Sequence, residues 1–319
     1  MANSSDAVVS RQLAPMQSRP RTGISRLKLR RNVVGWLFIM PWFLGFLIFS
    51  LGPFLTSLWL SFTSWELIGP ANWVGTRNFT TLFTEDQRFT KTLFNSLYYT
   101  VFYVPLTLVL AFFIALLLNE QVKGRALFRT AFYLPSVSSG VGTMLLWVWL
   151  LNNDGLVNYF LGVVGIDGPN WLGSTEWAMP ALIMMSLWGL GGTMIIYLAG
   201  LQAIPQYLYE AVAIDGGGAW AKLRHVTFPQ MTPSIFFTLI IGVIDSLQVF
   251  SAAYVMTEGG PADSTLFYLL YLYYQAFRYF RMGYASAMAW MLFLLILVLT
   301  IVQLRLARRW VYYEGQESH

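Results

Sequence analysis

The sequence predicts an all-α, polytopic membrane protein with six transmembrane helices and both termini in the cytoplasm. The 319 residues are 56% hydrophobic and 17% aromatic but only 11% charged, whereas soluble domains carry about 25% charged residues. The apolar residues gather in runs long enough to cross about 30 Å of hydrocarbon as helices. The Lys and Arg residues gather at alternate ends of these runs, as membrane topology requires.

Six apolar segments are expected to be spans. Each should be helical, because hydrocarbon offers the backbone no other hydrogen-bond partners. Pro41 and Pro53 lie in the first and longest segment, which is therefore expected to kink or tilt. Its apolar run is too long for a signal peptide and a polar tail precedes it, so we expect no cleavage. The six segments cover residues 33–61, 93–118, 130–151, 179–201, 234–256 and 284–304.

Basic residues predict the orientation of the spans. Fifteen Lys and Arg residues fall on the side of the two termini and five on the opposite side. The termini and the polar segment 202–233 are therefore expected in the cytoplasm. Since the bases flank apolar runs, the net charge of +5 reflects topology and contact with membrane lipids, and no nucleic-acid partner is expected.

The predicted organisation is a tail followed by one membrane domain. Residues 1–31 are rich in Ser, Arg, Gln and Pro and are expected to form a flexible, basic cytoplasmic tail. Its basic residues could be attracted to anionic lipid headgroups, or they could serve only to keep this end of the chain in the cytoplasm. Residues 32–319 are expected to form the transmembrane domain, with a core at about 93–306.

Several kinds of chemistry are excluded. The chain has no G-x-x-x-x-G-K-[ST] phosphate loop and no cysteine. Its two histidines, His225 and His319, fall in predicted cytoplasmic segments, so a His/carboxylate metal site within the membrane is not expected. No nucleophile–base arrangement is apparent. We therefore expect no catalytic activity, no metal and no cofactor in this chain.

Asp245 is an acid near the middle of the fifth span. An acid within the membrane costs free energy and points to function. It could couple transport to an ion in a stand-alone secondary transporter, although such relays usually contain several titratable groups. It could equally form a structural hydrogen bond to a neighbouring helix within a complex.

The longest polar interruption contains YEAVAIDGGGAWAKLRHVTFP, residues 209–229. A short helix is expected after Pro205, with an end at the three glycines. A second short helix should follow and end at Pro229. Trp220 and Leu223 share a face of that helix. The two short helices could lie on the membrane surface, or they could present their apolar and charged side chains to a soluble partner.

The same segment resembles the EAA motif of permease subunits of binding-protein-dependent ABC importers. That motif reads EAA, three residues, Gly, nine residues, then I-x-LP. This chain has Glu210-Ala211-Val212, then Gly216, then VTFP at residues 226–229. Val212, Val226 and Phe228 replace Ala, Ile and Leu, and none of these changes alters the charge or the glycine break.

The EAA resemblance implies the fold of a type I ABC importer permease. It also implies a coupling helix at about 215–225 that docks in a surface cleft of an ATP-binding subunit. ATP and Mg would bind in the ATP-binding subunits and not in this chain. Glu210 would anchor the loop and Gly216 would permit its turn. A connector that only maintains topology is the simpler alternative. The residues implied in this contact are Glu210, Ala211, Asp215, Gly216, Gly217, Trp220, Leu223 and Arg224.

A second resemblance concerns the substrate. The stretches VMTEGGPADSTLFYLLYLYYQAF (255–277), YLPSVSSG (133–140) and NNDGLVNYFLG (152–162) are similar to carbohydrate-importing permeases of the maltose and glycerol-phosphate type. Gly-Gly-Pro makes a tight turn whatever the substrate, so only the resemblance implies a sugar. It further implies a second homologous permease subunit, two ATP-binding subunits, an extracellular solute-binding protein and a bacterial cytoplasmic membrane.

Candidate substrate contacts lie in the fourth and fifth spans. Asp245 and Gln248 share a helix face, and polar groups with aromatic rings in an apolar concavity suit an uncharged polyol. Matching stretches of the resembling family include sugar contacts in one of its two permease subunits. This implies roles for Ser246 and Gln248, and less directly for Ser186 and Trp188. Ordinary helix packing is the alternative for the serines and for Trp188.

Overall fold

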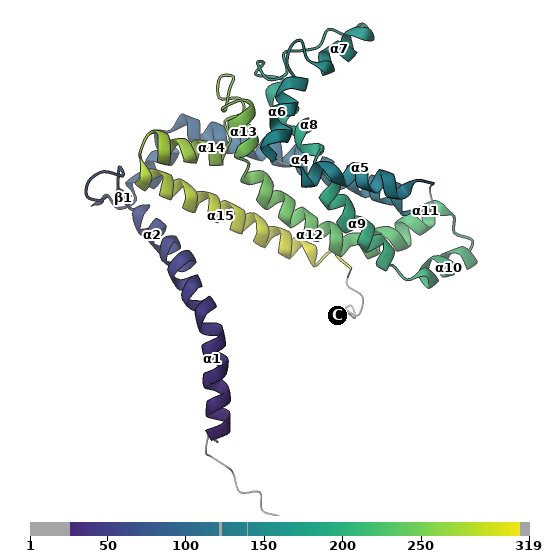
Figure 1. Ribbon diagram of the computed structural model, residues 1–319, viewed down its shortest axis with the longest axis horizontal. Coiled ribbons are helices and arrows are strands. Elements are labelled where there is room, and N and C mark those ends of the chain that lie inside the picture. The colour runs from purple at the N-terminus through teal and green to yellow at the C-terminus, as the bar shows by residue number, and fades with distance from the viewer. Residues whose placement is uncertain (1–25, 121–122, 139, 313–319) are drawn as a thin grey trace, which may run out of the picture. The chain divides into compact units, whose positions relative to one another are not determined.

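The structure, a computed structural model, describes residues 26–120, 123–138 and 140–312, with side chains from residue 32 onward (Figure 1). It divides at Leu55 into two units, described separately. The regular secondary structure of the described residues is helical, apart from one antiparallel strand pair, β1 (Thr63–Ser64) and β2 (Asn72–Trp73). Residues 1–25 of the predicted tail lie outside the described residues, and Arg26–Arg31 begin the first helix.

The N-terminal unit is one helical stretch. Helix α1 (Arg26–Phe46) leads through the π-helical turn η1 (Leu47–Leu51) into α2 (Gly52–Leu60), whose residues from Thr56 onward belong to the second unit. Within it, Asn32–Leu60 has a mean hydropathy of 2.0, and none of its most apolar window is buried. The π turn directly precedes Pro53, which has no N–H for a regular helical hydrogen bond, so the irregularity falls where proline predicts it.

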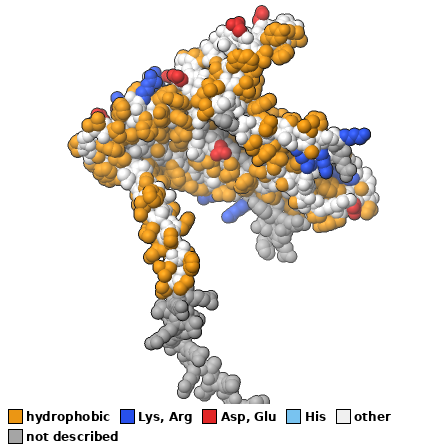
Figure 2. Space-filling model, viewed as in Figure 1, with side chains coloured by type: hydrophobic (Ala, Val, Ile, Leu, Met, Phe, Trp, Pro, Cys, Tyr) orange, Lys and Arg blue, Asp and Glu red, His pale blue; other side chains and the backbone are white. Residues whose placement is uncertain are grey.

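Among the described residues, four helical stretches are long and apolar enough to cross a membrane: Asn32–Leu60, Gln87–Asn119, Ala219–Leu247 and Met282–Ala307. Two bent helix pairs pass the same test when each pair is joined, which brings the total to six. The prediction of an all-α polytopic protein is confirmed, and each predicted span has a helical counterpart. On the visible face of the molecule, hydrophobic side chains predominate and charged ones are sparse (Figure 2).

The bent pairs are the third and fourth predicted spans. Helices α5 (Arg125–Val137) and α6 (Gly140–Leu150) meet at 100°, and α8 (Ala178–Leu187) and α9 (Gly191–Ala203) at 43°. The sequence after Pro135 is rich in Ser and Gly, which disfavour a continuous helix. At the second bend, an added Cβ on Gly191 would lie 2.2 Å from the carbonyl oxygen of Phe132. Only glycine therefore permits this approach of α9 to α5.

Helix α4 (Gln87–Asn119) is the centre of the second unit. It packs against α9, α12 (Phe228–Leu247), α8 and α14 (Tyr268–Tyr273). One buried cluster includes Phe89, Phe267 and Met288, at what we call the α14 end. A second, near the α11 end, is built on Ala111, Ala115 and Met231. Small residues on α4 permit the close helix contact typical of membrane bundles.

Shorter elements occupy the two ends. At the α14 end are α3 (Arg77–Thr84), α13 (Ser251–Met256), the π turn η3 (Tyr274–Arg278) and the start of α15 (Met282–Ala307). Helix α7 (Leu156–Val163) follows α6 on a projecting arm (Figure 1). At the other end are α10 (Gln206–Ile214), α11 (Ala219–Lys222) and the π turn η2 (Leu223–Thr227).

Two boundaries were predicted wrongly. Pro229 does not end the second short helix, because η2 joins α11 to α12 in one stretch of 29 residues, Ala219–Leu247. The π turn just before Pro229 accommodates its missing N–H. The fifth span was expected to continue to residue 256, but α12 ends at Leu247, and the backbone of the following Gln248 leaves helical geometry. Residues 251–256 form the separate helix α13.

Candidate functional site

The loop between α10 and α11 contains a glycine turn. The N–H of Asp215 donates to the carbonyl of Ala211 at 3.1 Å, and that of Gly217 to Val212 at 2.8 Å. Gly216 has φ +76°, the left-handed geometry that ends helices and favours glycine. An added Cβ on Gly217 would lie 2.5 Å from Val212 Cγ1 and 2.9 Å from its carbonyl oxygen. The predicted helix break is confirmed, and two of its three glycines have a steric reason.

The loop presents both apolar and charged side chains to solvent. Ile214 and Trp220 are 86% and 71% exposed, unusual for such large apolar groups. Glu210, Ala211, Asp215, Gly216 and Arg224 are exposed, whereas Gly217 and Leu223 are partly buried. Ile214 was not predicted, although its place as the last residue of α10, next to the glycine turn, is the signal that could have shown it.

An apolar hollow adjoins this loop. Trp220, Leu223 and Arg224 line a cavity of about 380 Å³, together with Phe112, Phe113, Leu116 and Phe228. Trp220 and Leu223 thus share a surface, as their spacing predicted. The walls come from α4, α11, η2 and α12, so the cavity joins the loop to the central helix.

The loop is connected directly to the two helices that flank it. Helix α10 begins three residues after α9 ends, and α11 is continuous with α12. The Tyr209 hydroxyl is hydrogen-bonded to the Thr227 hydroxyl at 3.1 Å, which joins α10 to η2. Deeper in the bundle, Tyr197 of α9 and Thr238 of α12 share a hydrogen bond of 2.6 Å. A displacement of the loop would therefore move α9 and α12 together.

Asp245 lines a hollow of about 120 Å³ between α4, α9 and α12. Polar groups from all three helices reach it: Tyr103 and Thr107 from α4, Thr193 from α9 and Thr238 from α12. No ion pair of Asp245 occurs among the described residues. The volume suits water or one small polar group of a solute.

Ser246, the next residue in the chain, does not line the hollow at Asp245. Its side chain is 1% exposed and donates a hydrogen bond of 2.9 Å to the Thr100 hydroxyl of α4. It also donates to the carbonyl of Val243 at 3.0 Å. In this conformation Ser246 therefore joins α12 to α4, which corresponds to the packing role that the sequence left open.

Gln248 is exposed at the end of α12, and its Nε2 donates to the carbonyl of Ile244 at 3.2 Å. Its N–H donates to the Asp245 carbonyl at 3.1 Å. The amide oxygen of its side chain makes no hydrogen bond within the described part of the chain. Gln248 can thus offer an acceptor to a solute near the carboxylate of Asp245.

Trp188 and Ser186 lie at the bend between α8 and α9. Trp188 is 53% exposed, and its ring meets that of Trp147 of α6 edge to face, with centroids 5.9 Å apart. Ser186 is partly buried in the last turn of α8. Neither residue lines the hollow at Asp245. Trp147 was missed because its partner is 41 positions away in the sequence.

The Gly-Gly-Pro loop forms the predicted tight turn and is attached to α4. Its Thr257 and Thr265 hydroxyls are hydrogen-bonded at 2.6 Å, and Gly259 has φ +86°. Asn95 of α4 donates to the carbonyls of Asp263 and Leu266, at 2.9 and 3.0 Å. Arg88 forms an ion pair with Asp263, with N and O 3.1 Å apart. This loop therefore holds the start of α4 in place.

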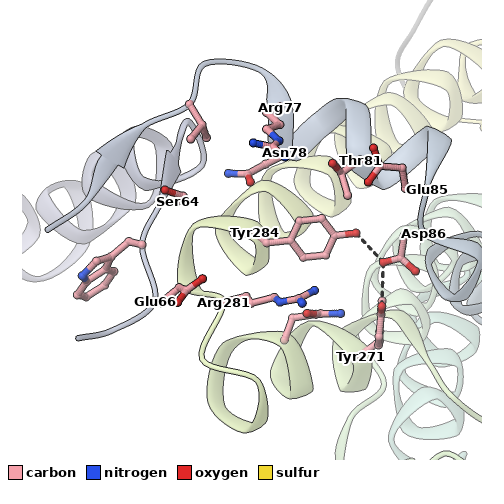
Figure 3. A pocket seen from close by; sticks show the side chains of 13 residues that line it. Ser64, Glu66, Arg77, Asn78, Thr81, Glu85, Asp86, Tyr271, Arg281 and Tyr284 are labelled. Atoms are coloured by element: carbon pink, nitrogen blue, oxygen red, sulfur yellow. Dashed lines mark hydrogen bonds between the residues drawn. The ribbon is translucent and has the colours of Figure 1, made fainter. Parts of the chain in front are cut away.

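At the α14 end lies a cavity of about 490 Å³, larger than the hollows at Asp245 and at Trp220 (Figure 3). Its walls come from the β1–β2 loop, α3, α14, η3 and α15. At its inner end Asp86 accepts hydrogen bonds from Tyr271 at 2.8 Å and Tyr284 at 2.5 Å. Burial, with a further contribution from Asp86, raises the pKa of Tyr271, so its hydroxyl remains a donor. No pattern in the sequence predicted this cavity.

A family model described as "Binding-protein-dependent transport system inner membrane component" matches residues 110–312. The chain is 41% identical over 298 residues to the probable ABC transporter permease protein YesP of Bacillus subtilis, covering 92% of this chain and 96% of the relative. It is 37% identical to the lactose transport system permease protein LacF of Rhizobium radiobacter, covering 90% and 98%.

The fold is also similar to that of a solved ABC transporter chain. A chain from the crystal structure of a bacterial alginate ABC transporter, in complex with an alginate pentasaccharide-bound periplasmic protein, superposes with a TM-score of 0.78 at 25% identity. The match covers 90% of this chain and 98% of that one. The protein is thus a multi-pass inner-membrane permease and not itself an ATPase. It belongs to the family of inner-membrane components of binding-protein-dependent transport systems.

Proposed function

We propose that this permease passes a sugar or sugar-like solute inward across a bacterial cytoplasmic membrane, driven by ATP hydrolysis in partner subunits. The observation that carries the proposal is the set of relatives that match nearly the whole chain. Besides LacF they include the trehalose/maltose permease MalF of Thermococcus litoralis, 33% identical, covering 89% of this chain and 97% of the relative. A similar solved structure is described as a transporter for the import of alginate, an acidic polysaccharide, which is also a carbohydrate.

The proposed assembly contains this chain, a second homologous permease subunit, two ATP-binding subunits and an extracellular solute-binding protein. The alginate-bound periplasmic protein in the similar structure supports the last partner. In the proposed orientation the termini and the α11 end face the cytoplasm, because 15 of the 20 Lys and Arg residues lie on that side. The α14 end then faces outward.

The coupling surface is the α10–α11 loop. Exposed Ile214 and Trp220 would enter an apolar cleft of an ATP-binding subunit. Glu210, Asp215 and Arg224 would form charged contacts around them, since charges at a rim give an interface its specificity. Movement of that subunit would be transmitted through α9 and α12, because the loop is continuous with both.

The solute would pass along the faces of α8, α9 and α12 that meet α4. We propose contacts with Asp245, Gln248 and Trp188. An exposed indole face and polar acceptors are the groups that a polyol uses. Ser246 would contribute by positioning, through its hydrogen bond to Thr100. Ser186 would contribute from the last turn of α8, next to Trp188.

The test is the ATPase activity of the assembled transporter in proteoliposomes, with and without solute-loaded binding protein. We expect loaded binding protein to stimulate hydrolysis, and Glu210→Ala to reduce the stimulation at least tenfold. Gln206→Ala, on the same helix, is the matched control and should preserve it. Uptake that an ionophore abolishes and ATP depletion does not affect would support ion-coupled transport through Asp245 instead.

A further inference from the structure

The large cavity at the α14 end is separate from the proposed membrane path. It lies among the β1–β2 loop, α3, α14, η3 and α15, whereas the hollow at Asp245 lies among α4, α9 and α12. In the proposed orientation it opens on the extracellular side. At about 490 Å³ it falls within the range of small-molecule sites.

The inner part of the cavity holds a buried polar atom without a partner. Gln275 is 4% exposed, and its Oε1 makes no hydrogen bond among the described residues. A buried acceptor without a donor raises the free energy of the folded protein relative to a satisfied one. The unmet need is for a hydrogen-bond donor from a bound molecule.

The rim carries unpaired groups of both signs. Glu66 and Glu85 supply carboxylates, and Arg77 and Arg281 supply guanidinium groups (Figure 3). All four residues are exposed, and Arg88–Asp263 is the one ion pair among the described residues. The rim therefore offers separate donors and acceptors.

The presence of both carboxylates and guanidinium groups at the rim favours some classes of ligand over others. A simple anion would meet Glu66 and Glu85, and a simple cation would meet Arg77 and Arg281. A ligand whose groups each donate and accept would satisfy both sets, and the hydroxyls of a saccharide do so. Trp65, Tyr271 and Tyr284 add aromatic surface for the apolar face of a sugar ring.

We propose that this cavity is a second saccharide-binding site, distinct from the membrane path, that holds one or two sugar units at the outer face. The proposal rests on the carbohydrate function proposed above. A sugar hydroxyl donates to Gln275 Oε1, other hydroxyls bridge the carboxylates and guanidinium groups of the rim, and the ring lies against Trp65. The site adjoins Asp86, which contacts α14 and α15, so an occupied cavity stabilises the packing of these elements.

The test uses the intact transporter in nanodiscs, without binding protein, and ligand-observed saturation-transfer NMR. The probes are lactose, maltose and trehalose. Gln275→Leu removes the buried acceptor, and Arg281→Gln removes a rim donor without changing a buried residue. Gln87→Leu, an exposed Gln→Leu change outside the cavity lining, is the matched control. Thermal unfolding is measured for every variant.

We expect at least one probe to bind, and both cavity variants to weaken its affinity at least tenfold while Gln87→Leu has no effect. Arg281→Gln should leave the unfolding temperature unchanged, which separates binding from folding. Saccharide binding that survives both cavity variants would overturn the second site but leave the carbohydrate permease intact.

Two other results would also overturn the proposal. If Arg281→Gln weakened docking of the binding protein but not probe binding, the cavity would be a protein contact. If no saccharide bound, and none stimulated ATP hydrolysis with binding protein present, the proposed carbohydrate function would fail together with the second site.

Discussion

The hydroxyl of Tyr284 donates a hydrogen bond of 2.5 Å to Asp86, across 198 positions of sequence. The same carboxylate oxygen accepts from Tyr271 at 2.8 Å, and the other oxygen caps α4 by accepting from the N–H of Phe89 at 3.0 Å. One side chain therefore both begins α4 and holds α14 and α15 against it.

Removal of this carboxylate should destabilise the α14 end. Asp86→Ala loses a helix cap, which costs about 1 kcal/mol, and leaves two tyrosine hydroxyls without an acceptor, at about 1–3 kcal/mol each where burial is complete. We expect a fall in unfolding temperature of several degrees, measured in detergent by tryptophan fluorescence. Glu85→Ala, an exposed neighbour, is the control, and an equal fall in both variants would contradict the role of Asp86.

Ser246 and Thr100 should behave as one structural pair. Ser246→Ala and Thr100→Ala each remove the hydrogen bond between α12 and α4, at a cost of about 1 kcal/mol. The double variant should cost less than the two single costs combined, because the pair can be lost only once. Additive losses of stability, or a solute KM changed by Ser246→Ala alone, would instead support direct solute contact by Ser246.

The three glycines of the coupling loop should differ in tolerance. Gly216→Ala places a side chain at φ +76°, and Gly217→Ala brings a Cβ against Val212. Both should reduce the ATPase stimulation by loaded binding protein severalfold. Gly218→Ala should be tolerated, since nothing lies within 4 Å of its added Cβ. Equal tolerance of all three changes would show that the turn geometry is not needed for coupling.

Asp245 should influence the affinity for the solute and should not change the dependence of transport on ATP. Asp245→Asn keeps the shape and removes the charge, so we expect a change in solute KM of about threefold to thirtyfold, the size of one hydrogen bond. Uptake should remain dependent on ATP and insensitive to ionophore. If the variant abolished a dependence of uptake on the proton gradient, the ion-coupled alternative would replace the permease assignment.

The spans were predictable because the bilayer imposes length and helicity on apolar runs. The turn at Gly216 was predictable for a local reason, the left-handed geometry of a helix end. The continuation of α11 into α12 was not, because a π turn before Pro229 cannot be distinguished from a helix end by composition. The 100° bend between α5 and α6 follows Pro135, but its angle depends on tertiary packing.

The site was predictable only where neighbours in sequence are neighbours in space. Helix periodicity separates Ser246 from the face shared by Asp245 and Gln248, yet its partner Thr100 lies 146 positions away. Asp86 appeared in the sequence as an ordinary loop acid, since both of its tyrosine partners are more than 180 positions distant. Gln275 became informative only once its lack of a hydrogen-bond partner was visible.

The most direct test of the coupling role is to measure ATP hydrolysis and solute uptake together in proteoliposomes that contain the complete transporter and loaded binding protein. The permease assignment predicts that Gly216→Pro abolishes both the stimulation of hydrolysis and the uptake, while the assembly still forms. Normal stimulated hydrolysis and normal uptake in this variant would contradict the assignment of the α10–α11 loop as the surface that transmits the energy of ATP.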